Sequence, residues 1–286
     1  MKSKILINLA LVAALVGLSL YAYFKPWQST APALKLTSLK RNEIERIGVE
    51  PRTGAPYKLE KKAGTWRLVA PLDAQADQTQ VDRLLDIASA PAKQKLANPD
   101  LRQLGLQPPQ VRVTLNDRVF AFGRVNDITY EQYVAAAGEV YLVPPLYGSD
   151  IPQEAAKLLS RRLLDAGEIP VGFDFGRYRI VRNDKGVWAA AGDFATAPDK
   201  GLSQDDFNRW ADEWRYTSAL SVTPYKDRGA GELITVRFRE GKTVTMRVLQ
   251  KQPEFQLVRE DNSLRYQFGV DVGRRLLDPR VVAANK

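Results

Sequence analysis

The 286-residue chain contains no cysteine and no histidine. The first absence excludes disulfides and thiol nucleophiles, and the second excludes any triad or metal site that needs an imidazole. Hydrophobic residues make up 44% of the sequence and charged residues 26%, which is ordinary for a folded protein. We therefore expect a well-packed protein without a familiar catalytic constellation, and we predict no cofactor, no bound metal and no enzymatic activity.

A long apolar run near the start of the chain predicts a membrane anchor. The run extends from Ile5 to Phe24, follows Lys2 and Lys4, and is long enough for a helix to cross the hydrocarbon core of a bilayer. A cleaved signal peptide is the alternative, but the nearest small-residue site, Ala31-Pro32-Ala33, lies late and contains proline. We favour a retained anchor, whose named residues are Ile5, Leu11, Leu15, Leu20, Phe24 and Trp27.

The distribution of charge also favours a membrane setting. The formal net charge is +9, and residues 1–62 alone hold 11 basic and four acidic residues. Basic residues beside an apolar segment suit anionic lipid headgroups, whereas a nucleic-acid binder carries its excess on a folded domain. Positive charge before the run predicts a single-pass membrane protein, with the N-terminus in the cytoplasm and the remainder on the outer side of the membrane. The predicted partner is the lipid bilayer, without nucleic acid.

The exported part of the sequence contains an internal repeat. Gly64-Thr65-Trp66 recurs as Gly186-Val187-Trp188, and three further stretches recur in the same order. They pair residues 77–84 with 203–210, 111–115 with 234–238, and 161–165 with 274–278. The predicted organisation is therefore an anchor region over residues 1–27, a linker over 28–35, a first module over 36–166 and a second module over 169–283.

Each module combines helical and strand patterns. Asp77 and Ser203 stand where helix N-caps are expected, and each precedes apolar residues at helical spacing. Alternation with a period of two follows in both modules, over residues 111–115 in the first and over 234–238 and 244–248 in the second. The prediction is an α+β fold, in which each of two tandem modules is an antiparallel sheet covered by a helix. The repeated Arg-Arg-Leu-Leu-Asp, at 161–165 and 274–278, is predicted to be helical in both copies.

At these residues the sequence resembles the bacterial family known as domain of unknown function 4340. The resemblance rests on residues 64–71, on Ala76-Asp77, on Leu104 to Pro109, and on the ending at residues 161–164. It covers residues 36–166 well and the second module loosely. The resemblance implies a membrane-anchored envelope protein, since some members are encoded beside ABC-type exporter subunits and gliding-motility-type auxiliary proteins. It implies no catalytic residues.

Acidic pairs and tryptophans are further candidate functional groups. Asp205 with Asp206, or Asp212 with Glu213, would be the acid and base of a carboxylate-dependent hydrolase. Neighbouring residues on a helix point about 100° apart, so a capping or surface role is preferred. The tryptophans at positions 66, 188, 210 and 214 would suit carbohydrate stacking, but their spacing favours the core.

Three arginines of one predicted hairpin, Arg237, Arg239 and Arg247, form a possible patch for an anion or an acidic partner. The alternative is a solvated sheet face. We accordingly expect a non-enzymatic, membrane-anchored periplasmic binding or scaffolding protein, an accessory of an envelope or ABC-type export complex. The alternatives are a carboxylate-dependent envelope hydrolase and an anion- or glycan-binding module.

Overall fold

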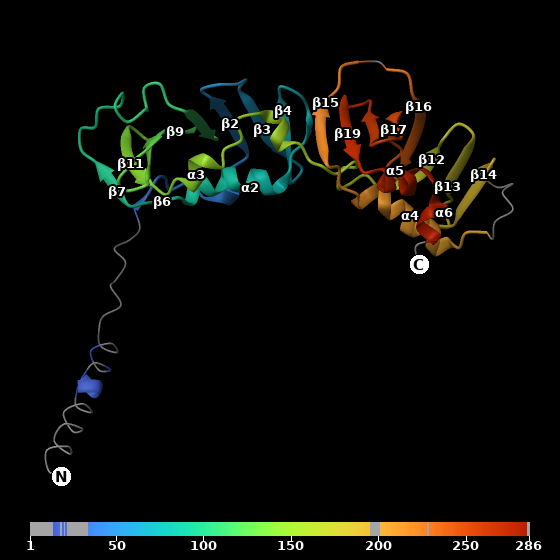
Figure 1. Cartoon of the computed structure of the whole chain (residues 1–286), viewed down its shortest axis with the longest axis horizontal. Coiled ribbons are helices and arrows are strands. Elements are labelled where there is room, and N and C mark those ends of the chain that lie inside the picture. The colour runs from blue at the N-terminus through green and yellow to red at the C-terminus, as the bar shows by residue number, and fades with distance from the viewer. Residues whose placement is uncertain are drawn as a thin grey trace, which may run out of the picture.

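The computed structural model describes residues 14–17, 19, 21, 34–194, 201–227 and 229–284 (Figure 1). It confirms the α+β class, because two large antiparallel sheets are each covered by helices. Most of the predicted anchor lies outside these residues, and no helix within them is long and apolar enough to cross a bilayer. Of the named anchor residues only Leu15 is described, and it is helical and 64% exposed.

The first sheet has nine strands in the order β5-β4-β3-β2-β8-β9-β10-β11-β7. Helix α2 (Gln78–Asp86) follows β5, and α3 (Leu146–Ser149) follows β11. A separate pair, β1 (Leu34–Lys35) with β6 (Pro91–Ala92), lies beside this sheet. The strands of the nine-stranded sheet are β2 (Arg46–Pro51), β3 (Tyr57–Lys62), β4 (Thr65–Ala70), β5 (Ala74–Gln75), β7 (Gln94–Leu96), β8 (Val111–Leu115), β9 (Arg118–Val125), β10 (Gln132–Ala136) and β11 (Glu139–Val143).

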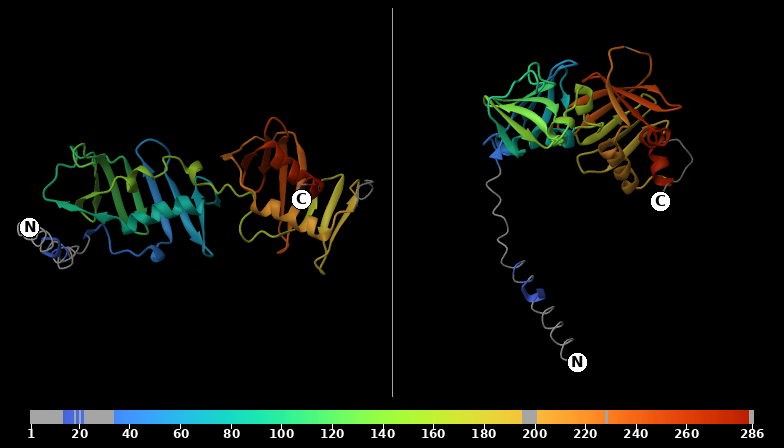
Figure 2. Two further views of the ribbon diagram at one scale, coloured as in Figure 1. Left: turned by 60° about the horizontal axis from the view of Figure 1, so that its bottom comes forward. Right: turned by 60° about the vertical axis from the view of Figure 1, so that its left-hand side comes forward.

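The second sheet has eight strands in the order β14-β13-β12-β16-β17-β18-β19-β15. Helix α4 (Gln204–Tyr216) lies between β14 and β15 in the chain, and α5 (Val270–Leu277) and α6 (Pro279–Ala284) follow the last strand. The strands are β12 (Pro170–Asp174), β13 (Tyr178–Arg182), β14 (Trp188–Gly192), β15 (Ser221–Pro224), β16 (Glu232–Phe238), β17 (Thr243–Gln250), β18 (Phe255–Arg259) and β19 (Leu264–Phe268). Figure 2 shows α2 and α4 along the same side of the molecule.

Both sheets are built on one plan. Without its extra edge strand β5, the first sheet has the same strand order as the second, and β7 and β15 both pair with the last strand of their sheet. The first residues of β3 and β13 are tyrosines that make the same kind of tether. Tyr57 donates its hydroxyl hydrogen to Pro152 O at 2.6 Å, and Tyr178 donates to Leu277 O at 2.5 Å. The topology therefore agrees with the repeat seen in the sequence.

Helices α2 and α4 begin directly after the predicted N-cap residues, Asp77 and Ser203. The side chain of Asp77 accepts hydrogen bonds from Thr79 N and Gln80 N, and the side chain of Ser203 accepts from Asp206 N in a capping box. The buried residues of the two helices are those of the predicted apolar faces, with Asp206 in addition: Val81, Leu84 and Leu85 in α2, and Phe207, Trp210, Ala211 and Trp214 in α4.

The predicted core role of the tryptophans is confirmed. Trp66 and Trp188 are each 3% exposed, and Trp210 and Trp214 are fully buried. Trp66 and Trp188 each follow a hairpin turn with a glycine at positive φ, +82° at Gly64 and +79° at Gly186, which residues with a Cβ rarely adopt. Trp27 lies outside the described residues.

The prediction of a helix at both copies of Arg-Arg-Leu-Leu-Asp is wrong for the first. Residues 274–277 lie in α5, but residues 161–165 are not helical. The leucines are buried or half-buried in both copies. The first copy differs because its backbone is bound by the second module, where Ala219 N–H donates to Arg161 O at 2.9 Å. A helix would use that carbonyl internally.

Candidate functional site: the junction between the two sheets

Where the chain passes from one module to the other, consecutive residues are hydrogen-bonded first to one module and then to the other. Ser160 N–H donates to Gln75 O, in the edge strand β5 of the first sheet, at 2.9 Å. The next residue, Arg161, already accepts a hydrogen bond from Ala219 of the second module, and its neighbour Arg162 forms an isolated β-bridge with Ser218. Two consecutive residues therefore belong to different modules, which restricts how the modules can turn relative to one another.

Arg259, the last residue of β18, is the centre of a buried ionic cluster at this junction. It is 2% exposed. Its guanidinium binds Glu168 through two hydrogen bonds, of 2.6 and 2.5 Å, and Asp261 through two more, of 2.8 and 3.0 Å. A fifth bond, of 3.1 Å, goes to Leu163 O. All five N–H groups of the fork are thus satisfied, as a buried arginine requires.

Lys242, from the turn between β16 and β17, completes the cluster. Its Nζ lies 2.8 Å from Glu168 Oε1 and 3.3 Å from Asp261 Oδ2. Two cations and two anions balance, so the cluster is neutral. Buried ion pairs contribute little net stability, but breaking one leaves an uncompensated charge. The geometry therefore fixes the segment between the two modules to the second sheet. This segment, residues 160–169, carries Glu168 and is the linker referred to below.

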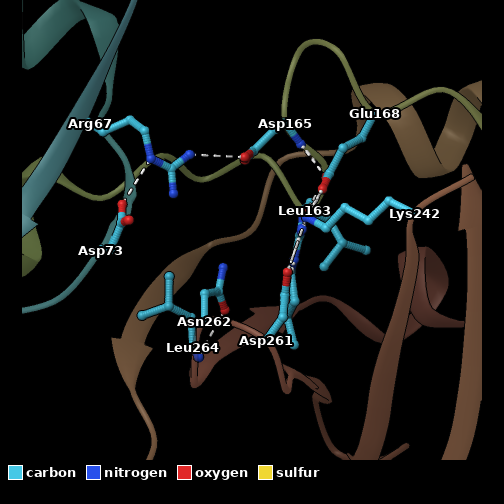
Figure 3. Close-up of polar contacts among 10 residues, drawn as sticks. Arg67, Asp73, Leu163, Asp165, Glu168, Lys242, Asp261, Asn262 and Leu264 are labelled. Atoms are coloured by element: carbon cyan, nitrogen blue, oxygen red, sulfur yellow. Dashed lines mark hydrogen bonds and ion pairs between the residues drawn. The ribbon is translucent and has the colours of Figure 1, made fainter. Parts of the chain in front are cut away.

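The contacts continue from the linker to the first sheet (Figure 3). Asp165 N–H donates to Glu168 Oε2 at 2.9 Å, and the Asp165 carboxylate lies 3.2 Å from the guanidinium of Arg67 in β4. Arg67 is also bound to Asp73, at 2.8 Å. A continuous series of hydrogen bonds thus joins β4 of the first sheet to β18 of the second.

The electrostatic environment keeps the acidic groups of this junction ionised. Burial alone would raise the pKa of Glu168, but hydrogen bonds and charge from Arg259, assisted by Lys242, outweigh burial and lower it below its ordinary value of 4.5. The same balance lowers the pKa of Asp261 below 3.8. Burial would lower the pKa of Arg259, but both carboxylates raise it, so the cluster is fully charged at neutral pH.

These shifts predict that acid weakens the junction. Because the pKa of Glu168 is lower in the folded than in the unfolded chain, the unfolded chain binds protons more readily, and stability is lost as the pH falls below about 5. The difference in melting temperature between the wild type and Glu168→Gln is expected to be larger at pH 7 than at pH 4. Glu139→Gln, at an exposed pair with Lys95, is the control and should show no such change. Equal differences for Glu168→Gln at both pH values would contradict the prediction.

Three of the four acidic residues that would serve a hydrolase are bound to arginines. Asp212 binds Arg215 at 3.1 Å, and Glu213 binds Arg275 at 3.0 Å. Asp206 binds Arg209 and the cap of α4, as its capping role predicts. Within the described residues, no group of three or more acidic side chains is placed to hold a metal ion. The geometry thus offers structural ion pairs rather than two carboxylates facing one substrate atom.

The three arginines of the predicted patch are not brought together. Arg237 and Arg239 line one hollow at the end of the second sheet, together with Arg182. Arg247 lines a different hollow, beside Tyr225 and Lys226, and is paired with Glu260. The sequence identified two members of this arginine group and missed Arg182, which comes from another strand.

An exposed apolar loop lies between β9 and β10 in the first module. Ile128 is 87% exposed and Tyr130 is 73% exposed. The loop is ordered by Asn126, whose side-chain oxygen accepts hydrogen bonds from Ile128 N at 2.9 Å and Thr129 N at 3.2 Å. The backbone of Tyr130 has φ +56°, which bulky residues rarely adopt. These two exposed apolar side chains on an ordered loop make it a candidate interaction site.

The fold and the junction define a tandem α+β protein whose two sheets are joined by a buried ionic cluster. Residues 66–204 match the model of the family described as Domain of unknown function (DUF4340), so this segment of the chain is assigned to that family. The matched segment runs from β4 into α4, so it contains Asp165 and Glu168 and extends beyond the first module. No curated protein and no solved structure matches the chain.

Proposed function

We propose that the chain is a non-catalytic scaffolding protein of the bacterial envelope. Residues 1–27 would anchor it in the inner membrane, and both modules would lie in the periplasm. It would act as an accessory of an envelope complex, such as an ABC-type exporter. The anchor is supported by the apolar run and its basic flank, and the accessory role by the family resemblance.

The junction is the observation that best supports a scaffold. A continuous ionic network from Arg67 to Arg259 fixes the linker to both sheets. Two modules held in this way present their outer surfaces at a constant separation, which is useful for arranging partners. An enzyme with its site in one module would not need this arrangement, and three of the four acidic residues that a hydrolase would use are bound to arginines.

The loop with Ile128 and Tyr130 is the proposed contact with a protein partner. Its acidic residues, Asp127 and Glu131, do not favour an anionic lipid surface. Because the loop is already ordered by Asn126, binding would cost little conformational entropy. An apolar pocket on a membrane-complex subunit is the partner surface that fits this pair.

Photo-cross-linking in intact cells tests this function. A photoreactive amino acid at position 128 is expected to form an adduct with an envelope protein. The same amino acid at Leu233, which is 47% exposed on β16, is the control and should not form that adduct. No adduct from position 128, or the same adduct from both positions, would contradict the proposal. A periplasm-active reporter fused after Lys286 tests the location separately.

A double variant provides the matching loss-of-contact experiment. Ile128→Ser with Tyr130→Ser is expected to remove the cross-linked partner from affinity purifications of the tagged chain. Because both side chains are exposed, the free energy of unfolding should change by less than about 0.5 kcal/mol. Retention of the partner at unchanged stoichiometry would show that another surface makes the contact.

A further inference from the structure

A hollow of about 600 Å³ lies at one end of the second sheet. Strand β12 begins there, β13 and β16 end there, and the two hairpin turns that follow β13 and β16 flank it. Three arginines line it, one from β13, one from β16 and one from the turn after β16: Arg182, Arg237 and Arg239. Asp184 is the acidic residue among its lining residues, and Glu240 lies in the adjoining turn.

Contacts with the surrounding backbone constrain each of the three arginines. Arg182 Nε donates to Gly186 O at 2.9 Å, and its guanidinium carbon lies 5.9 Å from the centre of the Trp188 ring. Arg237 lies over Gly172, where a Cβ would be 3.4 Å from its Nε. The backbone N–H of Arg239 is bound to Ile169 O at 2.9 Å. The side chains of Arg182 and Arg237 are therefore already in contact with the protein, which reduces the side-chain freedom that they lose on binding.

The three arginines carry positive charge that no carboxylate neutralises through an ion pair within the described part of the chain. No ion pair there involves Arg182, Arg237 or Arg239, although basic residues close to them in the chain are paired. Arg179 binds Asp174 at 2.7 Å, and Lys242 is committed to the junction cluster. Gathering three like charges at one place is unfavourable for folding, so an external anion is the simplest reason for it.

The first module shows that the fold does not need these arginines. Gly172 of β12 pairs with Arg237, and Gly48 of β2 pairs with Thr114, so Thr114 occupies the position of Arg237. Two residues further along, Asn116 occupies the position of Arg239. In the first module the side chain of Asn116 is hydrogen-bonded to the backbone. Its side-chain oxygen accepts hydrogen bonds from Glu45 N at 2.9 Å and Arg46 N at 3.1 Å, and its amide nitrogen donates to Glu43 O at 2.8 Å.

Basic residues also lie at this end of the first sheet, in a hollow on the side that α2 covers, and there a charge is neutralised. Arg41 lines a hollow with Lys61, Trp66 and Asp82. It is bound to Asp82 and to Asp86 of α2, at 2.6 Å in each case. The second module lacks an equivalent arrangement around Arg237 and Arg239 among the described residues. The difference between two copies of one plan points to a ligand rather than to packing.

We propose that the hollow formed around Arg182, Arg237 and Arg239 binds a phosphate group. Three guanidinium forks beside one carboxylate suit a doubly charged oxyanion better than a single carboxylate. The phosphate belongs either to a soluble molecule or to a lipid headgroup, because the chemistry of recognition is the same. The proposal does not depend on the anchor or on the scaffolding role.

Calorimetric titration of the full chain in a neutral detergent tests the proposal, with inorganic phosphate and pyrophosphate as probes. Both are expected to bind, pyrophosphate more tightly, with an affinity that falls as salt is raised. Arg237→Ala with Arg239→Ala should weaken binding by about tenfold or more, since hydrogen bonds to charged groups are lost. Arg102→Ala with Arg118→Ala removes the same charge from exposed sites of the first module and should leave binding unchanged. Circular dichroism checks that both variants fold.

Absence of phosphate and pyrophosphate binding, or an equal loss in both double variants, would overturn the proposal. A short-chain phosphatidic acid, used below its micelle concentration, distinguishes the two sources. Tighter binding of this lipid than of inorganic phosphate, abolished by the Arg237 and Arg239 substitutions, assigns the site to a lipid headgroup. Equal or weaker lipid binding assigns it to a soluble phosphate.

Discussion

Replacing Arg259 with alanine is expected to destabilise the protein by roughly 3–5 kcal/mol, because the Glu168 and Asp261 carboxylates would be left without their main partner. The loss is large because the Glu168 side chain is only 10% exposed and would lose its two charged hydrogen bonds to Arg259. The measurement is the free energy of unfolding from urea denaturation of the full chain in neutral detergent.

Two further variants identify the cause of this loss. Arg247→Ala removes an arginine that is paired with Glu260 but lies outside the junction, and it is expected to cost less than about 1 kcal/mol. Arg259→Lys keeps the charge but cannot form both bidentate pairs, so it should fall between alanine and the wild type. A loss for Arg259→Ala no larger than that for Arg247→Ala would show that the junction does not hold the modules together.

If the junction sets the orientation of the modules, Arg259→Ala should also change the shape of the molecule. Small-angle scattering of Arg259→Ala is expected to give a larger radius of gyration than the wild type below the unfolding transition. Glu168→Gln should change it less, because Asp261 still binds the guanidinium. An unchanged radius in a folded Arg259→Ala would separate the stability of the second module from its orientation.

Local chemistry explains why the secondary structure could be predicted from the sequence. Asp77 and Ser203 cap helices because their side chains reach backbone N–H groups two or three residues away. Trp210 and Trp214 are buried because four residues make about one helical turn, so both face the sheet. The repeat added long-range information, since two segments with the same pattern adopt the same strand order.

The junction could not be predicted in this way because its partners are far apart in the chain. Glu168 and Arg259 are 91 residues apart. The sequence held one indication of the buried arginine. Phe255, Leu257 and Arg259 alternate along β18 and therefore lie on its buried face, so the side chain of Arg259 points inwards. A charge at an inward position requires a buried partner, but nothing in the alternation identifies Glu168.

The arginine patch shows the same limit. Alternation correctly places Arg237 on the exposed side of β16, but it does not show which residues lie beyond the neighbouring strands. Arg247 is paired with Glu260, a residue that follows the adjacent strand β18. Arg182 joined the group because β12 lies between β13 and β16 in the sheet, and this order follows from strand pairing rather than from sequence pattern.

Replacing Trp210 with alanine is expected to destabilise the second module by roughly 3–5 kcal/mol, mainly by leaving a cavity beside Phe173. The ring of Trp210 lies 4.4 Å from that of Phe173, centre to centre, and its indole N–H donates to Leu276 O at 3.1 Å. Trp214 donates to the same carbonyl oxygen at 3.0 Å. This carbonyl belongs to α5, so two tryptophans of α4 bind the turn that ends α5.

Phenylalanine substitutions separate the hydrogen bonds from the packing. Trp210→Phe and Trp214→Phe should each cost about 1–2 kcal/mol, since the remaining indole still satisfies Leu276 O. The double variant leaves this buried carbonyl without either indole, so its loss should exceed the sum of the single losses by about 1 kcal/mol. Urea denaturation of the four proteins in the cycle provides the test. Strict additivity would show that the shared carbonyl does not couple the two tryptophans, and that α5 is held to α4 by apolar packing alone.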